Sequence, residues 1–292
     1  MSGTTQDLRM RLLAGCAVHE RRLELAGTST VVLEAGDGPP VLLLHGGIEC
    51  GGIYWAKVIA PLAQRHRVVV PDVPGLGESA PFSRLDLAHF FDWSAALLRQ
   101  TCREPPLLVA HSMFGSLAAR FAAQADAGAL RGLVIYAAPG VARYHMPIGL
   151  LLAAIRFGIR PSRPNIDRFA QWAFMPAEAS SRPDREWFEA LLAYVLECAK
   201  LAHVQRTMRR LIPIGRKRIP DEELRRIAIP TALLWGRHDR MAPLRVAEDA
   251  HARLGWPLHI IEDVGHVPHV DCPDAFLRAL RDAFGLDTTT NG

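Results

Sequence analysis

The stretch that decides the fold runs from Leu107 to Gly115 and reads LLVAHSMFG. Its first half is an apolar run of strand length, and a helical pattern begins directly after Ser112. A serine between a buried strand and a helix occupies a sharp, strained turn, where its hydroxyl stands clear of the sheet and the next backbone N–H points outward. The pattern therefore predicts an exposed serine nucleophile at the carboxyl end of a strand.

Working outward from this turn, short apolar runs alternate with helical segments along most of the chain. Continuous apolar runs of this length are typical of strands buried on both faces of a parallel sheet. A hairpin-like pair of strands around the turn at 26–29 leads into the sheet. The alternation predicts an α/β fold with a doubly wound, mostly parallel sheet of about eight strands. The predicted strands span 21–25, 30–34, 41–44, 68–70, 107–110, 132–137, 231–235 and 258–261.

The strand pattern disappears between about 140 and 221, where helical pieces are separated by prolines. Ligands of open α/β sheets bind outside the carboxyl ends of the strands, so an insertion leaving the strand that ends at Ala137 would form a cap over that crevice. We therefore predict a first core part (1–139), a helical insertion (140–221) and a second core part (222–292). Trp172 and Trp187 of the insertion are candidates for the substrate-pocket wall, with ordinary packing inside the insertion as the alternative.

A serine nucleophile needs a base to take its proton and an acid to orient that base. Asp239 follows a late strand in WGRHD, and His266 follows the last strand in EDVGHVP, which makes them the candidate acid and base. Asp72, after an earlier strand in PDVPG, is the alternative acid. The chain has 12 histidines, and those beside the candidate positions are His111, His238 and His269.

Five motifs follow one another along the chain: HGG at 45–47, PDVPGLGES at 71–79, AHSMFG at 110–115, WGRHDRMAP at 235–243 and DVGHVPH at 263–269. Together they resemble the α/β-hydrolase superfamily, particularly its capped serine esterase-like members. The resemblance extends from about 21 to 284, except for the insertion. It implies that Ser112 is the nucleophile, His266 the general base and acid, and Asp239 the residue that orients the imidazole.

The same resemblance implies a pair of backbone N–H groups that stabilise an oxyanion. The Met113 N–H is the first donor. The second comes from the loop that follows the strand at 41–44, where the N–H of Gly47 or of Ile48 is the candidate. Both are backbone groups, so the side chains do not choose between them.

Phe114 departs from the family pattern GxSxG, which has glycine two residues before and after the serine; this chain has Ala110 and Phe114 there. A small residue is favoured after the serine because the turn brings helix and strand together. We expect the phenyl ring to project toward the cap or a neighbouring loop and to narrow the substrate pocket.

Composition excludes several classes of protein. The net charge of +4 comes mainly from arginines interrupted by apolar residues, which is not typical of a nucleic-acid binder. The sequence has no HExxH motif and no His/Cys cluster with the spacing of metal ligands, so we expect no metal and no cofactor. Five scattered cysteines without a CxxC pair favour a reducing cytoplasm, and no apolar run predicts a membrane segment.

The leading functional hypothesis is hydrolysis of a small to medium, partly apolar carboxylic ester, lactone or thioester through an acyl-enzyme on Ser112. The expected partner is a small-molecule substrate, with no nucleic acid and no membrane; the oligomeric state stays open. One alternative is hydrolysis of a carbon–carbon bond in a vinylogous diketone. A second is a non-hydrolytic lyase, cyclase or small-molecule receptor on the same fold.

Overall fold

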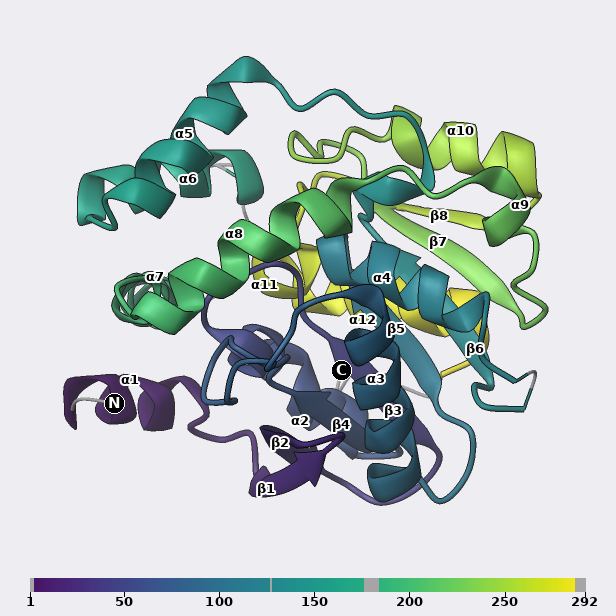
Figure 1. Ribbon diagram of the computed structural model, residues 1–292, viewed down its shortest axis with the longest axis horizontal. Helices are drawn as coiled ribbons and strands as arrows, with labels where there is room; N and C mark the ends of the chain where they lie inside the picture. Colours follow the sequence, from purple (N-terminus) through teal and green to yellow (C-terminus); the bar gives the residue numbers. More distant parts are fainter. Residues whose placement is uncertain (1–2, 127, 176–183, 287–292) are drawn as a thin grey trace.

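The computed structural model, shown in Figure 1, describes residues 3–126, 128–175 and 184–286. It has the predicted α/β-hydrolase fold, with one eight-stranded sheet in the order β1-β2-β4-β3-β5-β6-β7-β8. Strand β2 runs antiparallel to both of its neighbours, and the remaining pairs are parallel. The strands are β1 (His19–Leu25), β2 (Thr28–Ala35), β3 (Pro40–Leu44), β4 (Arg67–Pro71), β5 (Leu107–His111), β6 (Gly132–Tyr136), β7 (Thr231–Gly236) and β8 (Leu258–Ile261).

Helices cover both faces of the sheet. Helices α2 and α12 pack together on one face, and α3 and α4 pack together on the other. The helical segments are α1 (Gly3–Leu12), η1 (Gly51–Trp55), α2 (Ala56–Ala63), α3 (Leu87–Thr101), α4 (Ser112–Ala122), η2 (Pro139–Val141), α5 (Ile148–Ile159), α6 (Arg163–Ala173), α7 (Arg185–Ala199), α8 (Ala202–Arg216), α9 (Asp221–Leu224), α10 (Arg245–Leu254), α11 (Pro268–Asp271) and α12 (Pro273–Phe284).

The central strands are buried along their whole length, as their continuous apolar runs predict. Their register places Leu44 of β3 beside Ala110 of β5, and Ala110 beside Ile135 of β6. The three strands therefore end at nearly the same level. As a result, the loops and turns that follow them meet at one edge of the sheet.

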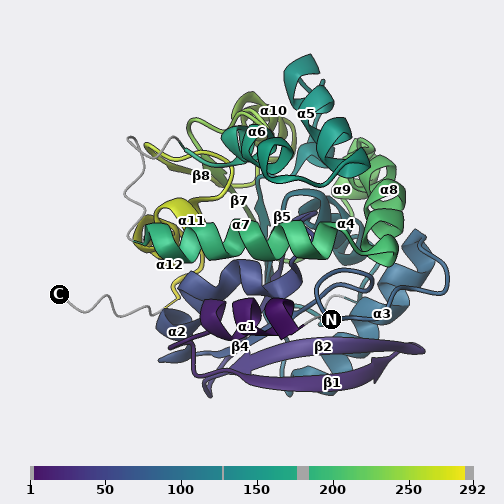
Figure 2. The ribbon, with the colours of Figure 1, turned by 90° about the vertical axis from the view of Figure 1, so that its left-hand side faces the viewer.

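Helices α5 to α8 fall within the predicted helical insertion, between β6 and β7 in the sequence. They lie above the edge where the parallel strands end (Figure 1). Helix α1, which the sequence did not predict, lies beside α7, as Figure 2 shows. The indole N–H of Trp187 on α7 donates to the Leu12 carbonyl at 3.1 Å, so α1 is tied to the insertion.

In the described part of the chain, no helix is long and apolar enough to cross a membrane.

Candidate active site

The turn between β5 and α4 holds Ser112 in a left-handed backbone conformation with φ of 54°. A non-glycine residue adopts this region only when the surrounding structure enforces it. The enforcing elements are β5, which ends at His111, and α4, which begins at Ser112 itself. The strain turns the serine hydroxyl away from the strand, as the sequence predicts.

Gly115 allows the close approach of α4 to the sheet. A Cβ atom at Gly115 would lie 2.7 Å from the Ala110 carbonyl oxygen and 2.9 Å from the Ala138 Cβ. No side chain fits into that space without moving a strand. The tight contact in this turn therefore falls three residues after the serine.

The structure brings Ser112, His266 and Asp239 together. The Nε2 atom of His266 lies 3.1 Å from the Ser112 Oγ, and its Nδ1 lies 2.8 Å from an Asp239 carboxylate oxygen. Because a carboxylate only accepts hydrogen bonds, the His266 Nδ1–H is the donor to Asp239. The Nε2 lone pair then faces the serine hydroxyl, in position to accept its proton.

The loop after β7 orients Asp239. One carboxylate oxygen accepts the backbone N–H groups of Met241 and Ala242, each at 2.8 Å. The other oxygen is the one bonded to His266. Asp239 is buried, so both oxygens have fixed partners and the imidazole is held in one orientation.

The three alternative histidines have other surroundings. His111 donates from Nε2 to the His266 carbonyl at 3.1 Å, and burial lowers its pKa well below the usual range. His269 contacts the Tyr136 hydroxyl at 3.2 Å, and burial likewise lowers its pKa strongly. His238 is exposed, and its Nε2 lies 3.9 Å from an Asp263 carboxylate oxygen. In this geometry none of them contacts the serine hydroxyl as His266 does.

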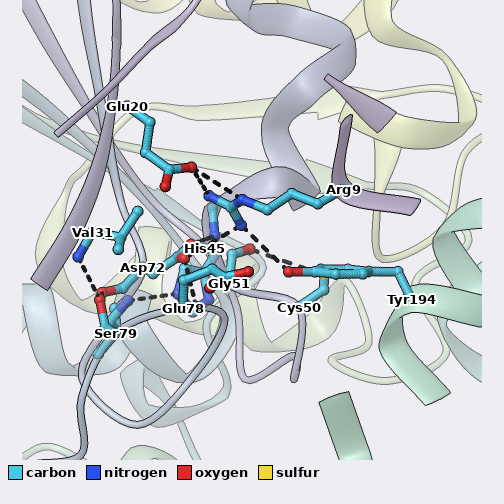
Figure 3. Close-up of polar contacts among 12 residues, drawn as sticks. Arg9, Glu20, Val31, His45, Cys50, Gly51, Asp72, Glu78, Ser79 and Tyr194 are labelled. Atoms are coloured by element: carbon cyan, nitrogen blue, oxygen red, sulfur yellow. Dashed lines mark hydrogen bonds and ion pairs between the residues drawn. The ribbon is translucent and has the colours of Figure 1, made fainter. Parts of the chain in front are cut away.

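Asp72, the alternative acid, belongs to a different network, which Figure 3 shows. Its two carboxylate oxygens accept the backbone N–H groups of Gly52 at 2.6 Å and Glu78 at 2.8 Å. The buried Arg9 guanidinium of α1 lies 3.6 Å from Asp72, and Arg9 also contacts the Tyr194 hydroxyl of α7 at 3.4 Å. Asp72 therefore joins two loops to α1 instead of orienting a histidine.

The loop after β3 packs directly over the serine turn. A Cβ at Gly46 would lie 2.6 Å from the His111 Nδ1, so only glycine fits there. The Ile48 N–H donates to the Gly46 carbonyl at 2.8 Å, which occupies this donor. Within residues 3–126, 128–175 and 184–286, the Gly47 N–H has no acceptor. The geometry therefore favours Gly47 over Ile48 as the donor available to a ligand.

A cavity of about 500 Å³ opens above Ser112. Its floor includes Gly47, Met113 and His266, and its walls come mainly from apolar side chains of α5 to α8. This volume is in the range of pockets that bind small organic ligands. The serine hydroxyl and the free backbone donor of Gly47 thus face an apolar chamber.

Comparison with known proteins identifies the family. A family model described as the alpha/beta hydrolase family matches residues 41–279. The chain belongs to the alpha/beta hydrolase family. It is 30% identical over 258 residues to an uncharacterized protein of Mycobacterium tuberculosis, covering 83% of this chain and 74% of that protein. It is 25% identical over 256 residues to the pimeloyl-[acyl-carrier protein] methyl ester esterase of Vibrio campbellii, covering 85% and 95%.

A solved structure with the same fold is the 2-hydroxy-6-oxo-6-phenylhexa-2,4-dienoate hydrolase of Rhodococcus. It superposes with a TM-score of 0.80 at 21% identity, over 92% of this chain and 99% of that one. At this level of identity, the likeness shows the α/β-hydrolase fold alone.

Within this alpha/beta hydrolase, the prediction that Phe114 narrows the pocket is wrong. Its ring is 1% exposed, stacks on Phe90 of α3 at 6.0 Å and meets the His45 ring edge-on at 5.3 Å. Phe114 is absent from the cavity lining. The side chain two positions after the serine points into the core because Gly115, one position later, takes the closest contact with β5.

The two tryptophans predicted for the pocket wall also lie outside the cavity lining. Trp187 packs toward α1 and lies beneath the Lys57 ammonium at 4.6 Å. Trp172 packs against Gly149 of α5 and holds the Arg240 guanidinium over its ring at 4.7 Å. Both tryptophans are therefore used in packing contacts and not in the cavity wall.

Sequence reasoning missed Glu49, which lines the same cavity in this hydrolase. It lies two residues after Gly47, and its backbone carbonyl accepts the Gly77 N–H at 3.0 Å. Burial raises the pKa of Glu49 to about 7. The only sequence signal was an acidic residue in an otherwise apolar and glycine-rich loop, HGGIECGG.

Proposed function

We propose that this chain is a serine hydrolase that cleaves a small to medium carboxylic ester, lactone or thioester. The observation that carries the proposal is the hydrogen-bonded series Ser112–His266–Asp239 beneath an apolar cavity. A serine hydroxyl becomes nucleophilic when a neutral imidazole can take its proton and a carboxylate holds that imidazole. The esterase relative from Vibrio supports the ester bond as the one cleaved.

In this mechanism the Ser112 Oγ attacks the substrate carbonyl carbon while His266 takes the hydroxyl proton. The carbonyl oxygen becomes an oxyanion, and the N–H groups of Gly47 and Met113 stabilise it. His266 then gives its proton to the leaving oxygen or sulfur, the carbon–heteroatom bond breaks, and an acyl-enzyme remains. His266 next activates a water molecule that hydrolyses the acyl-enzyme and restores Ser112.

The cavity supports a substrate with an apolar portion. Apolar groups such as Leu150, Phe157 and Leu192 line it, so burial of a hydrocarbon group contributes to binding. Its volume of about 500 Å³ accommodates a medium-sized acyl group or leaving group.

The test is hydrolysis of a chain-length series of p-nitrophenyl esters by the wild type and by Ser112→Ala. We expect turnover to fall about 10³-fold or more in the variant, because the triad acts as a unit. Ser94→Ala is the matched control, since the hydroxyl of this buried serine donates to the Phe90 carbonyl of its own helix α3. Retention of more than a tenth of the turnover in Ser112→Ala would refute the nucleophile. No turnover of any ester by the wild type would refute ester hydrolysis and leave the carbon–carbon hydrolase and the receptor as alternatives.

A second candidate is carbon–carbon bond hydrolysis. The arginines Arg209 and Arg216 line the cavity, and they could bind the carboxylate of a dienoate. The discriminating assay offers a 2-hydroxy-6-oxo-dienoate and a p-nitrophenyl ester to the same preparation. A dienoate cleaved with the higher kcat/KM would favour the carbon–carbon hydrolase over the esterase.

A further inference from the structure

Helix α5 carries an exposed apolar stripe. Among the described residues, the large hydrophobic side chains that are exposed all lie on α5, apart from Met10. Their spacing of three or four residues places them along one side of the helix. The stripe residues and their exposed fractions are Ile148 76%, Leu151 41%, Leu152 45%, Ile155 46% and Ile159 78%.

The opposite side of α5 is an ordinary packing face. Leu150, Ala153 and Phe157 are buried, and the Phe157 ring stacks on Phe169 of α6 at 6.0 Å. The helix therefore does not need the exposed stripe for its own packing. Exposed apolar patches of this kind are typical of surfaces that bind another protein or a membrane.

Positive charge surrounds the stripe. From 139 to 166 the chain contains four arginines and no Asp or Glu, and one of the four, Arg163, is paired with Asp167 and Glu189. Arg156 lies in the last turn of α5 and Arg160 directly follows the helix, and both are exposed. Within the part of the chain that the structure describes, neither is paired with a carboxylate. An apolar helix face flanked by unpaired arginines is typical of helices that lie in the surface of an anionic bilayer.

The stripe is continuous with the cavity above Ser112. Leu151, Ile155 and Ile159 belong both to the exposed stripe and to the cavity lining. The mouth of the cavity is therefore bordered by the same side chains that face outward. A molecule leaving a lipid surface at α5 would meet a mainly apolar lining on its way to the serine.

We propose that α5 docks on an anionic lipid surface with its stripe inserted among the acyl chains. Its 12 residues are too few to cross a bilayer, so the helix lies in the interface. Two copies paired through this stripe with parallel helices would bring the arginines at the C-terminal end of one α5 against those of the other, and repulsion disfavours that contact. An antiparallel pair would keep them apart, and the oligomeric state measured below distinguishes it from lipid docking. Resting on the proposed function, the docking identifies the substrates as amphiphilic esters that enter the cavity from the lipid surface.

The binding test is sedimentation with vesicles of phosphatidylcholine, with and without phosphatidylglycerol. We expect the wild type to bind the anionic vesicles more tightly. The variants Ile148→Ser/Leu152→Ser and Arg156→Glu/Arg160→Glu each lose about tenfold or more in affinity, because one removes inserted apolar groups and the other reverses the attraction. None of these four residues lines the cavity.

Two matched controls isolate the docking surface. Met10→Ser removes the exposed apolar side chain of α1, which is 61% exposed, and leaves binding unchanged. Arg103→Glu/Arg131→Glu makes the same charge reversal before β5 and β6, at the opposite edge of the sheet, and costs less than the reversal on α5. Equal losses in the controls and the α5 variants would overturn the proposal. So would an absence of vesicle binding, or a wild-type dimer that Ile148→Ser/Leu152→Ser dissociates.

Docking and catalysis are tested separately. Ser112→Ala keeps its vesicle binding, since that binding requires no turnover. The α5 variants hydrolyse a short water-soluble ester at the wild-type rate. Their rate of hydrolysis of an ester embedded in anionic vesicles is about tenfold lower than that of the wild type. Failure of the wild type on every ester would refute the proposed function and leave the binding result intact. Equal rates of wild type and α5 variants on the embedded ester would refute delivery from the lipid surface.

Discussion

Asp239 and Asp72 are both buried carboxylates at the carboxyl edge of the sheet, yet their surroundings differ. Asp239 follows β7, and the loop after that strand donates two N–H groups to one of its oxygens. The other oxygen accepts from His266. Asp72 follows β4; one of its oxygens accepts an N–H from the start of η1 and the other accepts one from the loop after β4, with Arg9 nearby.

The difference shows how one residue type serves two purposes in this hydrolase. A carboxylate can orient a histidine when the loop that holds it leaves one oxygen accessible to the imidazole. When both oxygens are taken by backbone donors, the carboxylate fixes the conformation of those loops instead. The loop that Asp72 fixes, through Gly52, is the one that carries Gly47. Asp72 therefore acts on the proposed oxyanion donor only through the backbone.

Asp239→Asn is the largest expected effect. The amide cannot accept the Nδ1–H of His266 and stabilise an imidazolium as a carboxylate does, so turnover of a p-nitrophenyl ester should fall by about 10³-fold. The melting temperature should change little, since Asn can still accept the N–H of Met241 and of Ala242. If Asp72→Asn, with its fold intact, loses more turnover than Asp239→Asn, the two assignments are reversed.

Asp72→Asn should act on stability. It removes one of the two carboxylates beside the buried Arg9, of which Glu20 at 2.7 Å is the other. It also turns an amide N–H₂ toward a backbone N–H, and together these changes cost about 3 kcal/mol of unfolding free energy. Denaturant unfolding measures that cost. Turnover per folded molecule should stay within about tenfold of the wild type. Arg9→Met is the companion variant: combined with Asp72→Asn, it should recover part of the lost stability, because no buried cation remains and Glu20, the other partner of Arg9, is exposed to water. If the losses of unfolding free energy in the two single variants simply add in the double variant, the two residues are not coupled.

Phe114→Ala tests a buried side chain that, like Asp72, packs against the loop after β3. The ring fills the space between Phe90 and His45, so its loss leaves a cavity and costs about 3 kcal/mol of unfolding free energy. The acyl-chain preference should stay that of the wild type, because Phe114 does not line the pocket. A chain-length series beside a denaturation curve checks both. A shift of preference toward bulkier acyl groups would show that the ring does shape the pocket.

Glu49→Gln should give the smallest effect, which depends on pH. Burial raises the pKa of Glu49 from 4.5 to about 7, so the folded protein binds this proton more tightly than the unfolded chain. Glu49 therefore makes the protein less stable as pH rises from about 4.5 to about 7, with no further loss above that range. The melting temperature of the wild type relative to Glu49→Gln should fall across this interval. Parallel melting curves at all pH values would contradict the raised pKa.

The positions of the strands could be predicted because a buried strand is recognisable from its own apolar run, whereas the order of the strands in the sheet comes from the structure. The apolar runs of β3, β5, β6 and β7 are each bounded by turn residues, and each was expected within one or two residues of its place. Helix α1 was not expected. Its sequence is largely polar, and it is held by contacts with α7 that lie some 175 residues away along the chain. Helices stabilised mainly by distant packing give only a weak local signal.

The sequence by itself determined the order of Ser112, Asp239 and His266 at strand ends, because a parallel sheet brings the carboxyl ends of its strands to one edge whatever the side chains between them. Tertiary structure alone decided the direction of Phe114, the use of the Ile48 N–H by Gly46, and the packing of Trp172 and Trp187 away from the cavity. Each of these depends on which neighbour occupies the adjoining space. Backbone periodicity predicts which residues are buried, but the partner of a buried side chain is fixed only when separate elements pack together.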